Sequence, residues 1–402
     1  MKQMNSRSAG IFVVLGTLLA ATSARATDGY FDIGFGVKAK GIGGVGVAFP
    51  QDALAPATNP AGISFLPSRA DVGVTWFKVD RGASLGGGSF DGNQTSNFFI
   101  PELGVTYHLP DRFTVGLAVY GNGGLNTDYT TPIPPFGTTN AGISLTQIFV
   151  APTVAFAITP RHSVGLSPVL AYQRFQAKGL ENFGITYSGY DSSYGAGVRV
   201  GYSGQITDWL SAGATYQSRT YASKFADYKN LFAEQGDFDI PSNFAVGVAV
   251  KLVRKLALAV DVERILFSEV KSVGNPLNAQ TFGNGTNLGA NDGPGFGWND
   301  VTVVKVGASF AATDQLTLRA GYNYSTQAVP TDQTFFNILA PAVVQHHLTL
   351  GLTFAATQHV ELSALYIHAF EHEVKGAGNF NNGDANLHMN QNSVGLAVGY
   401  VF

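Results

Sequence analysis

The sequence has no cysteine, few charged residues and no long apolar run after its N-terminal segment. The absence of cysteine excludes disulfides, thiolate metal sites and cysteine nucleophiles. Only 13% of the 402 residues are charged, about half the roughly 25% of a soluble domain. The net charge of −3 provides no basic surface for nucleic acid. A helical membrane protein is also excluded, because each span needs about 20 consecutive apolar residues.

Glycine and aromatic residues, by contrast, are abundant. The chain contains 49 Gly, 29 Phe and 16 Tyr, and 45% of it is hydrophobic. A disordered chain would lack so many aromatic residues. A sparsely charged, aromatic-rich and only half-apolar composition is typical of strands that turn one face to lipid and the other to water.

The first 26 residues have the features of an export signal. Lys2 and Arg7 give a positive start, residues 11–21 are apolar, and Ala24-Arg25-Ala26 fits a cleavage site. The apolar stretch is too short to span a bilayer. We therefore predict a signal peptide over residues 1–26, with a membrane anchor as the alternative.

From about residue 69 onward, apolar side chains occupy every second position. In the last segment, Val394, Leu396 and Val398 alternate with Gly395 and Ala397. A period of two predicts strands, not helices. The opposite face carries mostly small residues, as the inside of a filled barrel requires.

About fourteen such segments occur, an even number typical of bacterial outer-membrane barrels. The connections between them alternate between short and long, which predicts short periplasmic turns and long outer loops. The fold class is therefore all-β, a transmembrane antiparallel β-barrel of about 14 strands over residues 69–402. The predicted strands lie near 69–79, 99–109, 112–121, 144–159, 162–176, 189–207, 209–220, 241–253, 255–268, 297–312, 315–327, 344–356, 359–371 and 389–402.

Residues 27–68, called the hatch below, are too irregular for strands. Residues 41–46 match G-x-G-x-x-G, but neither a preceding strand nor a following helix supports a dinucleotide site. Glycine that permits close packing and positive φ is the better interpretation. We expect the hatch to fold back as a plug inside the lumen.

One long connection shows helical spacing. Phe225, Tyr228, Leu231 and Phe232 recur at that spacing, which predicts a short amphipathic helix near 221–236. Two roles are open: these residues pack the loop, or they form an apolar landing surface for a hydrophobic ligand.

Several motifs resemble the FadL/TodX (OMPP1) family of outer-membrane channels for long-chain fatty acids and hydrocarbons. They are the run 36–48, Asp52-Ala53, Asn59-Pro60-Ala61-Gly62, the stretch 236–241 and the Tyr-x-Phe ending at Phe402. The resemblance extends over the whole mature chain. It implies passive uptake without enzyme activity: capture in an outer groove, hatch rearrangement and lateral exit where the third strand kinks.

The resemblance also suggests residue roles. It places a ligand pocket beside the mature N-terminus, where Tyr30, Phe31 and Phe35 lie. The lateral exit would lie at Gly121, Asn122, Gly123 and Gly124, although an ordinary glycine-rich loop start explains these residues equally well. The hatch residues singled out are Gly43, Gly44, Gly46, Asn59, Pro60, Ala61 and Gly62.

The cation that would meet a cargo carboxylate is left open. Arg174 matches a Tyr-x-Arg of the family, yet simple alternation puts it on the lipid side unless Pro168 causes a bulge. Lys305 and Arg199 share parity with small lumen residues and are alternatives. Solvation of the lumen or an ion pair to the hatch is the competing explanation for both.

Other functional classes have little support. The eight histidines have no spacing that fixes a metal geometry, and no G-x-S-x-G is present. A general porin would need opposed charges in an open lumen, and an adhesin-like barrel is a third possibility.

We expect no cofactor and no metal. The expected partners of a monomer are a hydrophobic ligand, outer-membrane lipid and lipopolysaccharide in a Gram-negative bacterium. The cargo, whether fatty acid or aromatic or aliphatic hydrocarbon, is left open.

Overall fold

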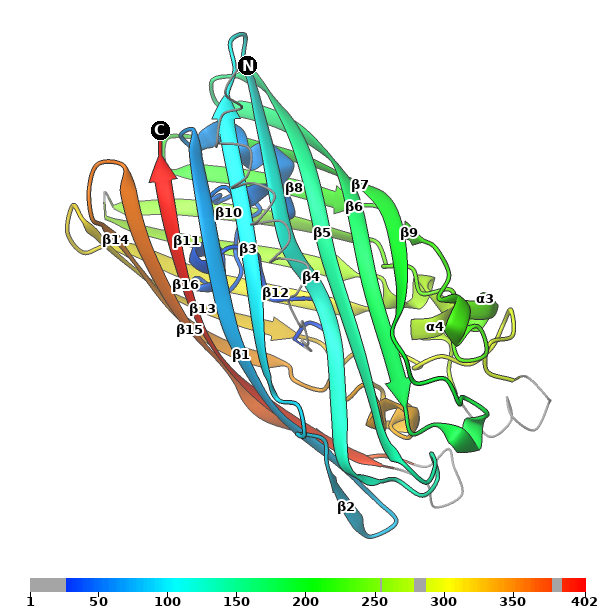
Figure 1. Cartoon of the computed structure of the whole chain (residues 1–402). Helices are drawn as coiled ribbons and strands as arrows, with labels where there is room; N and C mark the ends of the chain where they lie inside the picture. The colour runs from blue at the N-terminus through cyan, green and yellow to red at the C-terminus, as the bar shows by residue number, and fades with distance from the viewer. Residues whose placement is uncertain (1–26, 254, 278–286, 378–384) are drawn as a thin grey trace, which may run out of the picture.

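The computed structural model describes residues 27–253, 255–277, 287–377 and 385–402, so the predicted signal peptide lies outside the described residues. Within these ranges, 14 antiparallel strands form a ring that closes where β1 (Arg69–Leu85) pairs with β16 (Asn386–Val401) (Figure 1). The predicted antiparallel barrel is therefore confirmed.

The strands between these two follow one another around the ring in chain order. They are β3 (Asn97–His108), β4 (Phe113–Pro132), β5 (Asn140–Thr159), β6 (His162–Lys178), β7 (Asp191–Gln205), β8 (Leu210–Gln217), β10 (Asn243–Val253), β11 (Leu256–Ile265), β12 (Val301–Ala311), β13 (Leu316–Ser325), β14 (His346–Ala355) and β15 (Val360–Val374). Two short strands, β2 (Gly88–Asp91) and β9 (Tyr221–Ala222), pair with β1 and β7 outside the ring.

Helical segments are short and lie in the hatch and the outer loops. In the described part of the chain, no helix combines the length and the apolar character needed to cross a membrane. The α-helical turns are α2 (Val37–Lys40), α3 (Ala233–Gly236) and α4 (Lys271–Gly274). The 3₁₀ turns are η1 (Ala55–Ala57), η2 (Pro60–Phe65), η3 (Glu181–Phe183), η4 (Ala226–Tyr228), η5 (Phe267–Glu269), η6 (Thr331–Gln333) and η7 (Phe336–Ile338).

The alternation seen in the sequence determines which side chains face outward. On β14, Leu348, Leu350 and Leu352 are exposed on the outside of the ring, whereas Thr349 between them is buried. An apolar outer face suits lipid, and small inner residues leave room for a filled lumen.

The largest extensions beyond the predicted bounds occur in two strands. β1 continues to Leu85 instead of ending near residue 79, and β4 continues to Pro132 instead of ending near residue 121. Both extensions lie at the end of the ring that carries the long connections. Their polar outer faces weaken the alternation there, although the backbone pairing continues.

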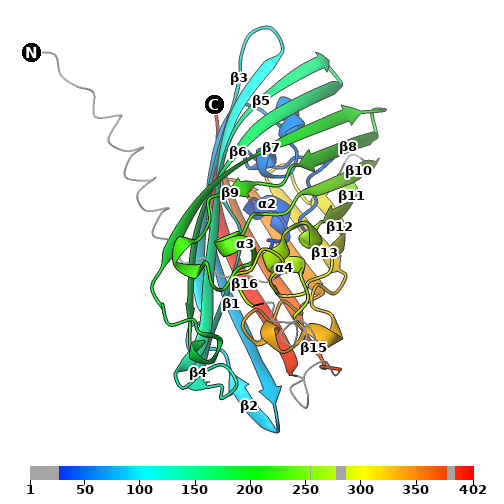
Figure 2. The same cartoon turned by 90° about the vertical axis from the view of Figure 1, so that its right-hand side faces the viewer.

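The hatch occupies the interior of the ring, as Figure 2 shows for α2. Its backbone approaches the wall at glycines, where an added Cβ would lie 2.0–3.0 Å from a hatch atom. No larger residue fits such spacings without movement, so the small inner face of the wall is shaped to the hatch. The glycines are Gly104, Gly165, Gly201, Gly213, Gly307, Gly321 and Gly351.

Candidate functional site

An aromatic cluster lies where the start of the hatch meets the outer loops. The Tyr30 ring is 5.2 Å from Phe31, 5.2 Å from Phe267, 5.7 Å from Trp298 and 6.2 Å from Phe238, measured between centroids. All five residues are buried. Tyr30 and Phe31 belong to the hatch, and the other three come from the two outer loops around residues 218–242 and 266–300. The cluster therefore joins the hatch to the outer surface layer.

The predicted helix near 221–236 is not formed. This segment contains β9, η4 and α3, and Glu234 and Gln235 adopt the left-handed conformation (φ 55° and 57°) within α3. The helical spacing placed Phe225, Tyr228 and Phe232 together, but packing against the wall replaced regular helix by successive turns. A short isolated helix has little stability of its own.

The loop aromatics form a packed interior beneath the surface. Phe232 lies 4.7 Å from Phe175 of β6 and 4.7 Å from Phe238, between ring centroids. Tyr228 accepts a hydrogen bond from Ala177 N at 2.9 Å, and burial raises the pKa of Tyr228 to about 12. Because Phe225 and Leu231 are buried as well, these side chains pack the loop and present no open landing surface in this conformation.

Two outer loops are held together by charge. Within its own loop, Arg219 donates to Asp239 at 2.7 Å and to Asp237 at 3.3 Å. Between the two loops, Arg219 Nη1 donates to Glu269 O at 2.7 Å, and Lys271 contacts Glu234 at 3.1 Å. Burial, and secondarily the charge of Asp239, raises the pKa of Asp237 to about 6. The loops that cover the aromatic cluster are thus crosslinked to each other.

The wall has an incomplete seam between β3 and β4. These strands pair only from Leu103–Val119 to His108–Thr114, and the outer half of β3 pairs with β1 alone. Residues 92–94 meet β4 again at Asp128, with Gly92 O accepting from Asp128 N at 3.2 Å. Between Val119 and Asp128, no strand in the described part of the chain therefore pairs with β4 on its β3 side.

The hatch fills this interval of the seam. Phe31 forms a bridge with Gly123, Gly124 N donates to Tyr30 O at 3.0 Å, and Asp32 N donates to Asn122 O at 3.2 Å. Three hatch residues thus act as a short substitute strand, because backbone N–H and C=O groups need partners where water is excluded.

The glycines predicted at the exit lie within this interval. Asn122 is an extra residue in the β4–β5 ladder, which shifts register between Gly121 and Gly123. A Cβ at Gly123 would lie 2.0 Å from Tyr30 O, whereas one at Gly121 would meet only the Ile100 side chain at 3.2 Å. Gly123 is therefore required for the hatch contact, and Gly121 is not.

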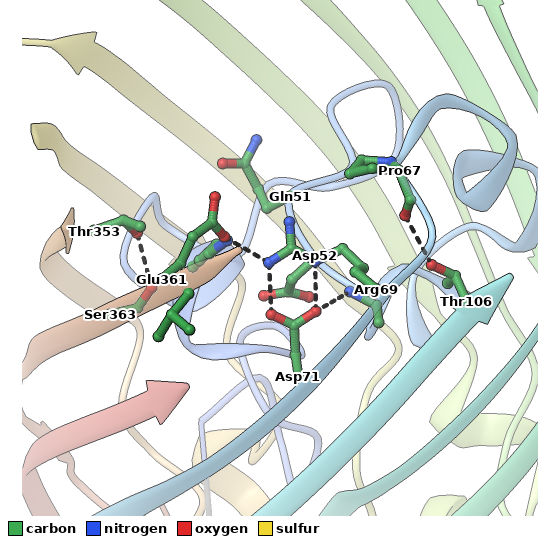
Figure 3. Close-up of polar contacts among 12 residues, drawn as sticks. Gln51, Asp52, Pro67, Arg69, Asp71, Thr106, Thr353, Glu361 and Ser363 are labelled. Atoms are coloured by element: carbon green, nitrogen blue, oxygen red, sulfur yellow. Dashed lines mark hydrogen bonds and ion pairs between the residues drawn. The ribbon is translucent and has the colours of Figure 1, made fainter. Parts of the chain in front are cut away.

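Hatch and wall are also joined by a charged network (Figure 3). Arg69 donates to Asp71 at 2.7 Å and to Glu361 at 2.6 Å, and Lys38 of the hatch contacts Glu361 at 2.5 Å. Asp71 also accepts from Ala53 N at 2.9 Å. Charge-assisted bonds of this kind are the strong ones, so the network pins the hatch near the short-turn end of the barrel.

Further anchors lie around the lumen. Asp261 of β11 accepts from Gly46 N at 2.7 Å and from Val47 N at 2.9 Å. Lys40 lies 3.1 Å from Glu102 of β3. Sequence reasoning missed the wall carboxylates Asp261 and Glu102. Each is a charged residue on a strand face of mostly small residues, and this contrast is the signal that would have identified it.

The hatch motifs serve turns and close contacts. Asn59 caps η2, because its Oδ1 accepts from Ala61 N at 3.1 Å, and its Nδ2 donates to Tyr202 O of β7 at 2.8 Å. Gly43 and Gly44 have positive φ (78° and 82°). The remaining predicted hatch residues, Gly46, Pro60, Ala61 and Gly62, are buried.

The predicted cations have different environments. Lys305 contacts Glu263 at 2.8 Å in the lumen. Arg199 donates to Gln217 Oε1 and contacts the hatch at Pro56 O at 3.4 Å. The bulge at Pro168 that would have turned Arg174 toward the lumen is not formed, because β6 keeps its register with β7 on both sides of Pro168. Arg174 therefore lies on the outer face, 4.1 Å from the centroid of Tyr190, and the structure does not bring it to the lumen.

Phe35, the last of the predicted pocket residues, is half-buried and lies 4.6 Å from the Tyr120 ring of β4. Deeper in the lumen lies a cavity of about 10 Å³ with a mixed lining, which includes Asp32, Thr75 and His347 as well as Ile33, Phe77 and Ile367. It has room for about one water molecule. Within the described ranges, no group of three or more His, Asp or Glu residues could hold a metal ion.

Comparisons with known proteins agree with this architecture. The profile of the family "Outer membrane protein transport protein (OMPP1/FadL/TodX)" matches residues 31–402. None of the curated proteins compared with the chain is significantly similar to it in sequence.

Solved structures share the fold at low identity. The Pseudomonas putida toluene transporter TodX is 16% identical with a TM-score of 0.72, over 92% of this chain and 99% of that chain. A Pseudomonas aeruginosa FadL homologue is 16% identical with a TM-score of 0.69, over 93% and 99%. The Ralstonia pickettii toluene transporter TbuX is 18% identical with a TM-score of 0.65, over 92% and 99%.

The family match covers residues 31–402, and the barrel has the same fold as these transporters. The chain thus belongs to the OMPP1/FadL/TodX family, and it is a Gram-negative outer-membrane transport channel for hydrophobic molecules, not an enzyme.

Proposed function

We propose that this channel takes up long-chain fatty acids passively and releases them sideways between β3 and β4. The single observation that carries this proposal is the incomplete seam, in which hatch residues 30–32 replace the missing strand contacts with β4. When those residues move, the wall opens toward lipid at a place where no strand must be broken.

The path to the seam is apolar. The aromatic cluster around Tyr30 lies between the outer loops and residues 122–124 of β4, because Tyr30 O contacts Gly124 N directly. A cargo that displaces these rings keeps its alkyl chain out of water, worth about 0.8 kcal/mol per CH₂. Lateral release then spares that chain a water-filled pore.

A second cargo class is supported by the same cluster. Rings line the route, and aromatic ligands stack well on aromatic side chains. TodX and TbuX are toluene transporters by their descriptions. We therefore keep aromatic or aliphatic hydrocarbons as the alternative cargo.

Because the ring closes within one chain, the proposed unit is a monomer surrounded by outer-membrane lipid and lipopolysaccharide.

A disulfide across the seam tests the lateral route. Ile100 of β3 and Gly121 of β4 are adjacent, with 3.2 Å between a Cβ at Gly121 and Ile100 Cγ2, and the chain has no cysteine of its own. We expect the double variant Ile100→Cys/Gly121→Cys to block uptake of radiolabelled palmitate by cells when oxidised. Reduction should restore uptake.

The control is a disulfide in a complete seam. Val246 and Val262 are register partners on β10 and β11, so Val246→Cys/Val262→Cys stiffens the wall without touching the exit. Oxidation of this variant should leave uptake unchanged. Full uptake by the oxidised β3–β4 variant would disprove lateral release, and parallel uptake of toluene identifies which cargo class the route serves.

A further inference from the structure

The outward face of β6 changes character toward the end that carries a long connection. Leu170 is 51% exposed on this face, and the next outward positions are occupied by Tyr172, Arg174, Gln176 and Lys178. An apolar face that gives way to tyrosine and then to cations is typical of the boundary between membrane lipid and its head groups. Because long connections lie on the outer side, this boundary belongs to the outer leaflet.

The neighbouring strands place the same boundary at the same height. Tyr172 is the register partner of Tyr194 of β7, and their ring centroids lie 5.4 Å apart. The next row toward the outside consists of Thr146 of β5, Arg174 and Ser192 of β7, which are register partners. Arg174 therefore lies one row beyond the tyrosines, with a hydroxyl-bearing residue on each side.

An aromatic ring orients the Arg174 guanidinium. Its Cζ lies 4.1 Å from the centroid of the Tyr190 ring, and Tyr190 is itself 46% exposed. A cation–π contact uses the face of the guanidinium and leaves its N–H groups in the plane for other partners. The side chain is thus held at the surface with its donors directed along the boundary.

No carboxylate in the described part of the chain forms an ion pair with Arg174. On the same face of β6, by contrast, Lys178 contacts Asp128 at 2.6 Å. Asp191, which precedes Ser192 on β7, accepts from Ser192 N at 2.7 Å and from Asp227 N at 2.9 Å. A charged donor beside lipid without a counter-ion favours an anion supplied by the surroundings.

A second outward cation shows what distinguishes the Arg174 site. Lys78 of β1 lies one outward position beyond Trp76, and among the described residues it likewise forms no ion pair. Asp80 follows at the next outward position of β1, so an anion at Lys78 would be close to a carboxylate. Beyond Arg174 the outward positions of β6 carry an amide and a second cation instead. Charge complementarity to an anionic head group is therefore better on β6.

We propose that Arg174 binds a phosphate of the lipopolysaccharide glycolipid in the outer leaflet. Its planar guanidinium donates two parallel N–H bonds to phosphate oxygens, and the Ser192 hydroxyl donates to the same group. The acyl chains of the glycolipid lie on the exposed apolar face around Leu170. The proposal rests on the outer-membrane location of the channel and is independent of its cargo.

Binding of lipid A to the purified full-length protein in detergent tests the proposal. Wild type, Arg174→Gln and Arg174→Lys are titrated with diphosphoryl lipid A and with the same lipid after removal of both phosphates. We expect Arg174→Gln to weaken binding of diphosphoryl lipid A about tenfold and to leave binding of the dephosphorylated lipid unchanged. Arg174→Lys keeps the charge without the bidentate geometry and should recover part of the affinity.

The matched control is Lys78→Gln, which removes an outward cation beside an aromatic residue on the opposite side of the incomplete seam. It should alter neither affinity, and heat-modifiable migration on gels checks that each variant forms the barrel. An equal loss in Lys78→Gln would show that only overall charge attracts the glycolipid, and this would overturn the proposal. An unchanged affinity in Arg174→Gln, an equal loss for both lipids, or displacement of lipid A by inorganic phosphate alone would also overturn it.

Discussion

Two seams of the same wall are built in different ways. The seam between β1 and β16 is hydrogen-bonded in register from Arg69–Val401 to Ser84–Asn386. The seam between β3 and β4 pairs only near the short-turn end, and hatch residues 30–32 complete part of the rest. A complete seam depends on strand pairing alone, whereas the incomplete one also depends on the position of the hatch. If the channel opens at this seam, as we propose, no strand has to unfold and only the segment that fills the gap has to move.

Deletion of the hatch should have the largest effect on the difference between the two seams. Without residues 27–68, the lumen loses its filling and the β3–β4 interval loses its substitute strand. We expect planar-bilayer conductance to rise from near zero to that of an open pore, because the lumen wall is small and polar. A large steady conductance of the intact protein would instead show that the hatch does not plug it.

A methyl group at Gly123 should weaken the incomplete seam alone. The added Cβ would lie 2.0 Å from Tyr30 O, and such overpacking costs about 1–3 kcal/mol. We expect Gly123→Ala to displace residues 30–32 and to increase channel opening in single-channel recordings. Gly121→Ala is the matched control, since its Cβ meets only the Ile100 side chain. Equal recordings for both variants would argue against a seam completed by the hatch.

Loss of Asp261, which anchors the hatch to a strand with complete seams, should have a smaller effect on the position of the hatch. Asp261→Ala leaves the N–H groups of Gly46 and Val47 without their acceptor. We expect hatch docking to weaken by about 2–3 kcal/mol, as for hydrogen bonds to a charged group. Hydrogen exchange at residues 46 and 47 should accelerate while the strands β10 to β12 remain protected. Unchanged exchange there would show that other anchors suffice.

Substitution of Arg174 should have the smallest effect. Because this side chain lies outside the ring against Tyr190, we expect Arg174→Ala to leave the affinities for palmitate and hexadecanol unchanged. A selective loss of palmitate affinity in this variant would return the carboxylate site to Arg174 and contradict the outward position.

The sequence by itself determined the barrel. Alternation with a period of two is a local property of the extended backbone, so it predicted strands, their faces and the side of short turns without knowledge of long-range contacts. Simple parity placed Arg174 on the lipid side, where the structure has it, but Arg174 was kept as a candidate ligand residue on the assumption of a bulge at Pro168, and that prediction was wrong. The family resemblance depended on contiguous motifs such as residues 59–62, which are equally local.

The tertiary structure alone decided the rest, because those features depend on partners far apart in the chain. Whether Phe225 to Phe232 forms a helix was settled by packing against Phe175 and Phe238, which outweighs the weak preference of a short segment. The interval in which β4 lacks β3 is filled by hatch residues 30–32, some ninety residues earlier in the chain than Gly123. That the buried Arg81 of β1 donates to Thr95 O and to Asn126 Oδ1 follows from the segments that pack beside β1, and no spacing within β1 encodes that arrangement.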